Sequence, residues 1–153
     1  MKIAILYGTE SGNAEIAAED AAEALDDGVV EVEVLDMSTA TLDQLLTADS
    51  VLVICSTHGE GDLPTGAQPF VARLDADKPD LTGVRYAMFG LGDRTYTNYS
   101  RGSEIVDEHL RALGAVRFGE YGRHDATGRV DVSDAVQQWA VNTVSTLHTG
   151  VGD

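Results

Sequence analysis

Hydrophobic residues in this chain fall into short, nearly unbroken runs that alternate with longer segments of helical spacing. An unbroken apolar run is typical of a strand that is covered on both faces of a sheet. Three runs have this character: residues 2–7, 50–56 and 84–91. The segment 29–37 instead alternates apolar and polar residues from Val30 to Leu35, which predicts a strand at the edge of the sheet. The run 115–122 predicts a fifth strand.

The segments between these runs place apolar residues three or four positions apart, as an amphipathic helix does. Five helices are expected: residues 13–27, 41–48, 67–76, 102–114 and 132–147. Because parallel strands need crossover connections, this alternation predicts an α/β fold, a five-stranded parallel sheet with helices on both faces. We expect one domain, residues 1–148, followed by a flexible tail at 149–153.

Glycine-rich loops follow the first, third and fourth of these strands. They cover residues 9–14, 56–67 and 90–100. In doubly wound sheets, ligands bind beyond the carboxyl ends of the strands, at the point where the strand order reverses. We therefore expect the three loops to open on one edge of the sheet and to form a common binding site.

The first loop has the composition of a phosphate site without a cation. It consists of Thr9, Glu10, Ser11, Gly12, Asn13 and Ala14. The two hydroxyls and the N–H groups of the helix that starts near Asn13 can surround an anion. The Lys and the Mg²⁺-binding Ser or Thr of a nucleotide triphosphatase loop are missing, so the loop can hold a phosphate but not transfer it. Glu10 is expected to point into solvent. The alternative is an ordinary helix start capped by Ser11 or Asn13.

The second loop combines backbone freedom with a histidine. Its candidate site residues are Ser56, Thr57, His58, Gly59, Gly61 and Asp62. Gly59, Gly61 and Gly66 allow positive φ angles or a close approach to a flat ligand, and His58 can stack on a ring or bond its edge. No G-x-S-x-G nucleophile elbow of a hydrolase occurs here. The spacing of the four histidines in the chain does not indicate a metal site.

The third loop offers aromatic faces. Its candidate site residues are Leu91, Gly92, Asp93, Tyr96, Tyr99 and Ser100. Stacking of Tyr96 on a large flat ring would contribute about 0.5–1.5 kcal/mol beyond simple burial, whereas Tyr99 is expected to be structural. A phosphate handle at the first loop and a planar slot between the other two describe a phosphorylated flat heterocycle such as FMN.

The net charge of the chain limits the kinds of partner that it can bind. The chain has 26 acidic against 10 basic residues, a net charge of −16, which disfavours nucleic acid and anionic lipid and favours basic protein partners. Adaptation to a salty cytoplasm explains the same excess of acidic residues, and both explanations stay open.

Cys55, the single cysteine, ends an apolar run and is expected to be a packing residue. The first apolar run is too short for a signal peptide or a membrane span, so we expect a cytoplasmic protein.

The three loops together resemble the flavodoxin family. "TESGNAE", "STHGEGD" and "GLGDRTY" are similar to the FMN-contacting segments of flavodoxins and of the FMN domains of cytochrome P450 reductase and sulfite reductase. The stretch "STHGEGDLP…KPDL…VR", within residues 56–85, is especially similar to short-chain, MioC-like flavodoxins. The resemblance implies the strand order 2-1-3-4-5 and an uninterrupted fifth strand, and flavodoxins are themselves an established example of a ligand bound at the switch point.

The resemblance also implies roles for single residues. Residues 9–14 would bind the phosphate of FMN, and residues 56–59 would line one side of the flavin, with His58 where reductase domains often carry a stacking tyrosine. Residues 91–100 would form the other wall, with Tyr96 coplanar with the ring. Asp125 would match an acidic residue that approaches FMN after the fifth strand.

The implied function is electron carriage rather than enzymatic catalysis. A monomer would pass electrons, in transient encounters, from a basic-faced flavin reductase to basic-faced acceptor proteins. The alternatives are an FMN-dependent reductase of quinones or other small molecules, or the FMN subunit of a split diflavin reductase. A third is a receiver-type signalling domain of the same sheet order, but that class needs a late lysine and the chain has none after Lys78.

Overall fold

The sheet is parallel and has the predicted strand order. The structure, a computed structural model, describes residues 2–10, 12–26, 28, 30–58, 62–92, 101–126 and 128–149. Its strands are β1 (Lys2–Gly8), β2 (Glu31–Asp36), β3 (Ser50–Ser56), β4 (Arg85–Gly92), β5 (Val116–Arg117) and β6 (Gly122–Asp125). The order is β2-β1-β3-β4-β5, with β6 also paired to β4. The α/β fold and the order 2-1-3-4-5 are therefore confirmed.

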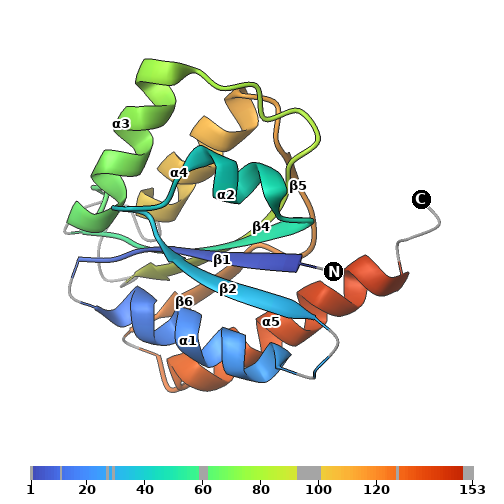
Figure 1. Cartoon of the computed structure of the whole chain (residues 1–153). Coiled ribbons are helices and arrows are strands. Elements are labelled where there is room, and N and C mark those ends of the chain that lie inside the picture. The colour runs from blue at the N-terminus through green and yellow to red at the C-terminus, as the bar shows by residue number, and fades with distance from the viewer. Residues whose placement is uncertain are drawn as a thin grey trace.

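Helices cover both faces of the sheet, as Figure 1 shows. They are α1 (Asn13–Leu25), α2 (Leu42–Thr47), α3 (Gln68–Asp77), α4 (Arg101–Ala112) and α5 (Val132–Thr149), with a 3₁₀ turn, η1 (Thr65–Ala67), leading into α3. The apolar faces of α1 and α5 pack on one side of the sheet, and those of α2, α3 and α4 pack on the other. Each predicted helix is present within a few residues of its expected bounds.

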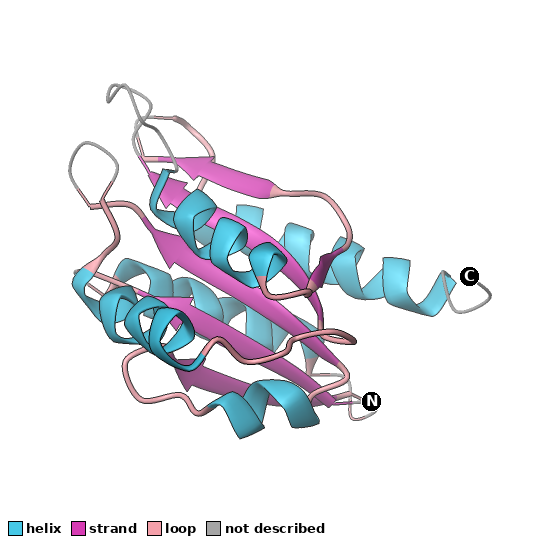
Figure 2. Cartoon of the chain, turned by 90° about the horizontal axis from the view of Figure 1, so that it is seen from above, coloured by secondary structure: helices cyan, strands magenta, loops and turns pink. Residues whose placement is uncertain are grey.

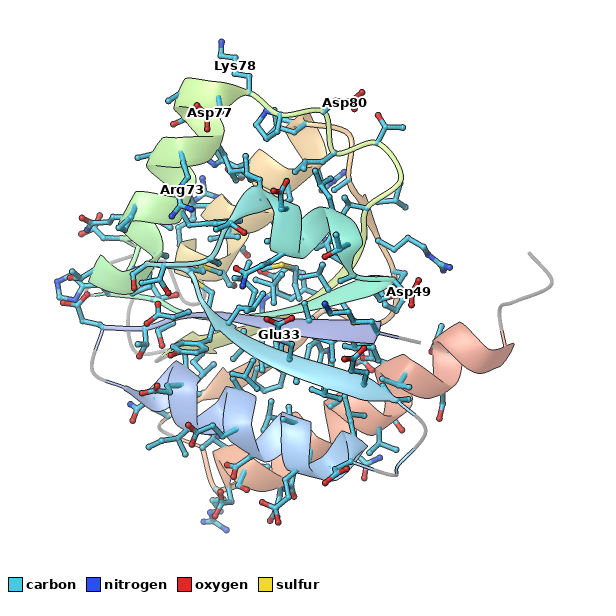
Figure 3. The ribbon with its side chains drawn as sticks, viewed as in Figure 1. Glu33, Asp49, Arg73, Asp77, Lys78 and Asp80 are labelled. Atoms are coloured by element: carbon cyan, nitrogen blue, oxygen red, sulfur yellow. The ribbon has the colours of Figure 1, made fainter. Side chains whose placement is uncertain are left out.

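The burial of the strands follows their hydrophobic pattern. Residues 3–8 of β1 and 50–55 of β3 are buried throughout, because each of these strands has a neighbour on both edges and a helix layer on both faces. In β2 only Leu35 is buried, and the strand lies at the edge of the sheet, which confirms the reading of its alternating pattern. Glu33 of this edge strand is labelled in Figure 3. Its partly exposed carboxylate lies 3.3 Å from the Lys2 ammonium group.

The fifth strand is interrupted, so the prediction of a continuous strand over residues 115–122 is wrong. β5 pairs Arg117 with Tyr86, and β6 resumes with Gly122 opposite Phe89. Four residues, 118–121, thus stand opposite only two on β4, and Gly119 in their middle has a φ of 72°. A glycine inside a strand pattern is the usual signal of such a bulge. The strand then runs on to Asp125, three residues beyond its expected end.

Cys55 is a packing residue in the core. Its side chain is fully buried at the end of β3, and this burial raises the pKa of the thiol to about 12. The thiolate, which is the reactive form, is therefore scarce at any pH at which the protein is handled. We expect no reaction of the native protein with a thiol reagent such as DTNB at pH 8, and one equivalent of reaction after unfolding in urea. Rapid labelling of the native protein would contradict this burial.

Candidate functional site

The three glycine-rich loops leave the sheet side by side, as predicted. Figure 2 shows the arrowheads of the parallel strands pointing to one end of the sheet. There Gly8, the last residue of β1, stands opposite Cys55 of β3, and Ser56 stands opposite Leu91 of β4. On the far side of β4, Gly92 stands opposite Asp125 of β6. We call this end of the sheet, with the described residues of the three loops and Asp125, the rim.

The first loop turns directly into α1. Gly12 is the N-cap residue, with a φ of 94°, and its N–H group donates a 2.8 Å hydrogen bond to the hydroxyl of Thr9. The predicted helix start near Asn13 is confirmed, but the cap is neither Ser11 nor Asn13. Because the N-cap residue has no side chain, the amides of the first turn, including that of Ala14, receive no side-chain cap from it. Apart from the neighbouring residues of the chain, no described heavy atom lies within 4 Å of the position that a Cβ on Gly12 would occupy.

Glu10 is exposed, as expected from the sequence, but its carboxylate is also hydrogen-bonded within the protein. Its carboxylate accepts a 2.5 Å hydrogen bond from the N–H group of Thr65 and others at 2.8 and 3.0 Å from the Thr65 hydroxyl. These bonds from the backbone and hydroxyl of Thr65 lower the pKa of the Glu10 carboxyl group. The acid in the first loop therefore has a partner 55 residues along the chain.

A second contact joins the same two segments. The Gly66 N–H group donates a 3.0 Å hydrogen bond to the carbonyl of Thr9. A Cβ on Gly66 would lie 2.7 Å from that carbonyl oxygen, closer than real Cβ atoms come. Gly66 thus allows the first loop, rather than a flat ligand, to approach closely.

The second loop is closed on itself and bound to α4. His58 and Asp62 exchange two backbone hydrogen bonds of 2.8 and 2.9 Å. The Thr57 hydroxyl accepts a 3.0 Å hydrogen bond from the N–H group of Gly102 in the first turn of α4. The His58 imidazole is about half exposed, with Nδ1 3.8 Å from the Glu10 carboxylate.

The remaining predicted residues divide into two groups. Leu91 is buried and Gly92 half-buried at the end of β4, and Asp125 lies across from Gly92 at the end of β6. The ends of β4 and β6 are held together because the Ala126 N–H group donates a 2.8 Å hydrogen bond to the Gly92 carbonyl. The other predicted site residues lie outside the described residues: Ser11, Gly59, Gly61, Asp93, Tyr96, Tyr99 and Ser100.

Three residues in or next to the rim were not singled out from the sequence. They are Tyr7, Thr65 and Gly102. Burial is the main cause that raises the pKa of the Tyr7 hydroxyl, and its 2.8 Å hydrogen bond to Glu15 of α1 is the second. The hydroxyl therefore stays protonated and donates to Glu15 in the first turn of α1. Thr65 begins the η1 turn that leads into α3, and Pro69 in the first turn of α3 is the signal in the sequence that marks this helix start. The contacts of Thr65 with Glu10 and of Gly102 with Thr57 join segments far apart in the sequence, so no local pattern predicts them.

In the part of the chain that the structure describes, no cluster of three or more His, Cys, Asp or Glu residues is arranged to hold a metal ion. A cavity of about 330 Å³ lies away from the rim, between β6 and α5, and Phe89, Tyr121 and Trp139 contribute to its walls. No helix among the described residues is long and apolar enough to span a membrane.

Comparison with known proteins identifies the family. The model of the family described as Flavodoxin matches residues 5–139 of the chain. The chain belongs to the flavodoxin family. Among solved structures, a cysteine-to-alanine mutant of the flavodoxin from Pseudomonas aeruginosa superposes with a TM-score of 0.85, at 31% identity, over 97% of this chain and 99% of that one.

Curated relatives of this flavodoxin-family chain include stand-alone and multidomain proteins. Protein MioC of Escherichia coli K12 is 32% identical over 145 residues, which are 95% of this chain and 97% of MioC. The NADPH-dependent diflavin oxidoreductase 1 of Schizosaccharomyces pombe is 34% identical over 148 residues, 95% of this chain. The chain spans only 25% of the length of that oxidoreductase.

Proposed function

We propose that this flavodoxin-family chain binds FMN at the rim and carries electrons from a flavin-containing reductase to acceptor proteins. The observation that carries the proposal is the convergence of the carboxyl ends of β1, β3 and β4 at one edge of the sheet, with hydrogen bonds that join the first loop to the second and the second loop to α4. Membership of the flavodoxin family supports both the cofactor and the role. Bound FMN would supply one- and two-electron redox chemistry, which no side chain can provide.

The start of α1 fits a phosphate monoester. Its first-turn N–H groups have no intrahelical acceptors, and Gly12 leaves the space before them open. The Thr9 oxygen already accepts the Gly12 N–H group, so its own hydrogen is available for donation to a phosphate oxygen. The Thr9 hydroxyl and the amides of Asn13 and Ala14 would thus hold the phosphate, together with the predicted contribution of Ser11.

The flavin ring would lie between the second and third loops. Ser56, Thr57 and His58 would line one side and Leu91 and Gly92 the other. The hydrogen bond between Thr57 and the first turn of α4 fixes the distance between the β3 and α4 sides of this slot. Stacking by Tyr96, and contributions from Gly59, Gly61, Asp62, Asp93, Tyr99, Ser100 and Asp125, are part of the proposal.

The acidic surface would select the partners. A net charge of −16 favours basic faces on the reductase and on the acceptor, and speeds encounters at low ionic strength. The diflavin relative from S. pombe is named as NADPH-dependent, which supports a reductase as the electron source. Salt screens such steering, so electron transfer should slow as ionic strength rises.

One experiment separates a carrier from a reductase. The protein loaded with FMN is mixed with NADPH, first alone and then with a flavin-containing NADPH reductase and cytochrome c as acceptor. We expect no NADPH oxidation by the protein alone, and cytochrome c reduction that depends on both proteins and falls between about 0.05 and 0.5 M salt. Steady NADPH oxidation by the chain alone, with quinone or another small acceptor, would favour the small-molecule reductase instead.

A further inference from the structure

A carboxylate in a loop that binds a dianionic phosphate needs a physical reason, because like charge weakens binding. Glu10 has its two oxygens within 3.0 Å of Thr65, at the start of η1 and α3. The carboxylate therefore meets the N–H end of another helix, where negative charge is favourable. About a third of its side chain remains exposed.

The first loop is hydrogen-bonded to the end of the second loop through two consecutive residues on each side. Thr9 accepts through its carbonyl from the Gly66 N–H group, and Glu10 accepts through its side chain from Thr65. Thr9 also accepts through its hydroxyl from Gly12, the N-cap residue of α1. One continuous chain of contacts thus runs from η1 through residues 9 and 10 to the amides at the start of α1.

We propose that Glu10 is a positioning residue which, by clamping the first loop to Thr65, holds the loop in the shape that binds the phosphate of the flavin. The inference rests on the proposed function, because it assumes FMN at the rim. In this role the Glu10 side chain does not touch the phosphate. Its bonds to Thr65 fix the backbone of the first loop, so that the Thr9 hydroxyl and the α1 amides face one point. The clamp explains why the loop carries an acid and no cation.

The clamp is charged under physiological conditions. Hydrogen bonds from Thr65 lower the pKa of the Glu10 carboxyl group in the folded protein. The stabilisation is therefore complete above the unfolded pKa and is lost only as pH falls through the lowered, folded value. His58 is a titratable neighbour on the facing loop, with Nδ1 3.8 Å from the Glu10 carboxylate, and its charge adds to the lowering of the Glu10 pKa.

The clamp and a simple charge effect predict opposite signs. If Glu10 acted only through its charge, removing that charge would strengthen the binding of phosphate. If it acts as a clamp, Glu10→Ala should lower FMN affinity about tenfold, and Thr65→Val, which removes the hydroxyl but keeps the backbone N–H bond to Glu10, should lower it by a smaller factor. Riboflavin, which has the same ring and no phosphate, should change less than about twofold, because the clamp acts on the phosphate end.

The test is a set of titrations, followed by flavin fluorescence, of FMN and riboflavin into flavin-free protein. Thr65→Ser keeps the hydroxyl and should retain most of the FMN preference that Thr65→Val loses. Glu19→Ala removes an equal charge from the exposed face of α1 and should leave the ratio of the two affinities unchanged. The melting temperature of each flavin-free variant separates a local effect from general destabilisation.

Each outcome has one meaning. A fall in the ratio of FMN to riboflavin affinity in Glu10→Ala and Thr65→Val, with rescue by Thr65→Ser, supports the clamp. An equal loss for both flavins, no change, or a gain in FMN affinity overturns it while leaving the proposed function standing. Failure of the wild-type protein to bind FMN overturns the proposed function, and the clamp with it.

Discussion

Replacing Asp107 with alanine should lower the free energy of unfolding by about 3 kcal/mol. The Asp107 carboxylate, 7% exposed, accepts a 2.6 Å hydrogen bond from the Tyr86 hydroxyl and a 2.8 Å bond from Arg117. Burial and the bond to Asp107 raise the pKa of Tyr86, so its hydroxyl remains a buried donor that needs an acceptor. The three residues join α4 to β4 and β5. Urea unfolding, followed by the fluorescence of Trp139, measures the loss.

A matched variant on the same helix tests whether burial is the cause. Glu108 pairs with Arg101 at 2.7 Å, but more than half of the Glu108 side chain is exposed. An exposed pair contributes little, so Glu108→Ala should cost less than about 1 kcal/mol. Asp107→Asn, which keeps an acceptor for Tyr86, should fall between the two. Equal losses in Asp107→Ala and Glu108→Ala would refute this account of α4.

The second large effect is expected from Gly102→Ala. A Cβ at this position would lie 2.4 Å from the Ser56 carbonyl oxygen and 2.8 Å from the Cα atom of Thr57. Both are backbone atoms of the rim, so the start of α4 must move away from β3. We expect a loss of about 3 kcal/mol in stability, as for an overpacked site, and weaker FMN binding, because the slot between the second and third loops widens.

Gly83→Ala is the control for this variant. Gly83 has a φ of 95°, and no atom lies within 4 Å of its Cβ position, so the substitution adds backbone strain without a clash. It should cost about 1 kcal/mol and leave FMN affinity unchanged. The measurements are urea unfolding and FMN titration of both variants. A Gly102→Ala protein that binds FMN like Gly83→Ala would show that the contact at α4 does not shape the site.

The fold was largely predictable because its hydrophobic pattern has little ambiguity. The apolar runs of β1, β3 and β4 have no polar face, so they require cover on both sides. The alternation in β2 indicated an edge position, which the structure confirms. Thr41 and Gln44 form a capping box at the start of α2, a signal carried within four residues.

The errors arose where the decisive contact is distant in sequence. Glu10 binds Thr65 across 55 residues, and no local pattern in the first loop indicates that partner. Gly102 meets Thr57 across 45 residues in the same way. The break before β6 did have a local signal, Gly119, but the apolar and aromatic residues around it favoured an unbroken strand.

The most direct test of the account is an NMR titration of the flavin-free, ¹⁵N-labelled protein with FMN. The account predicts saturation at one FMN per chain, with the largest amide shifts at Gly12, Asn13, His58 and Leu91. The amides around Trp139, which lines the cavity between β6 and α5, should move little. Absence of saturable binding, or shifts centred on that cavity with the rim unchanged, would contradict the claim that the three loops form the FMN site.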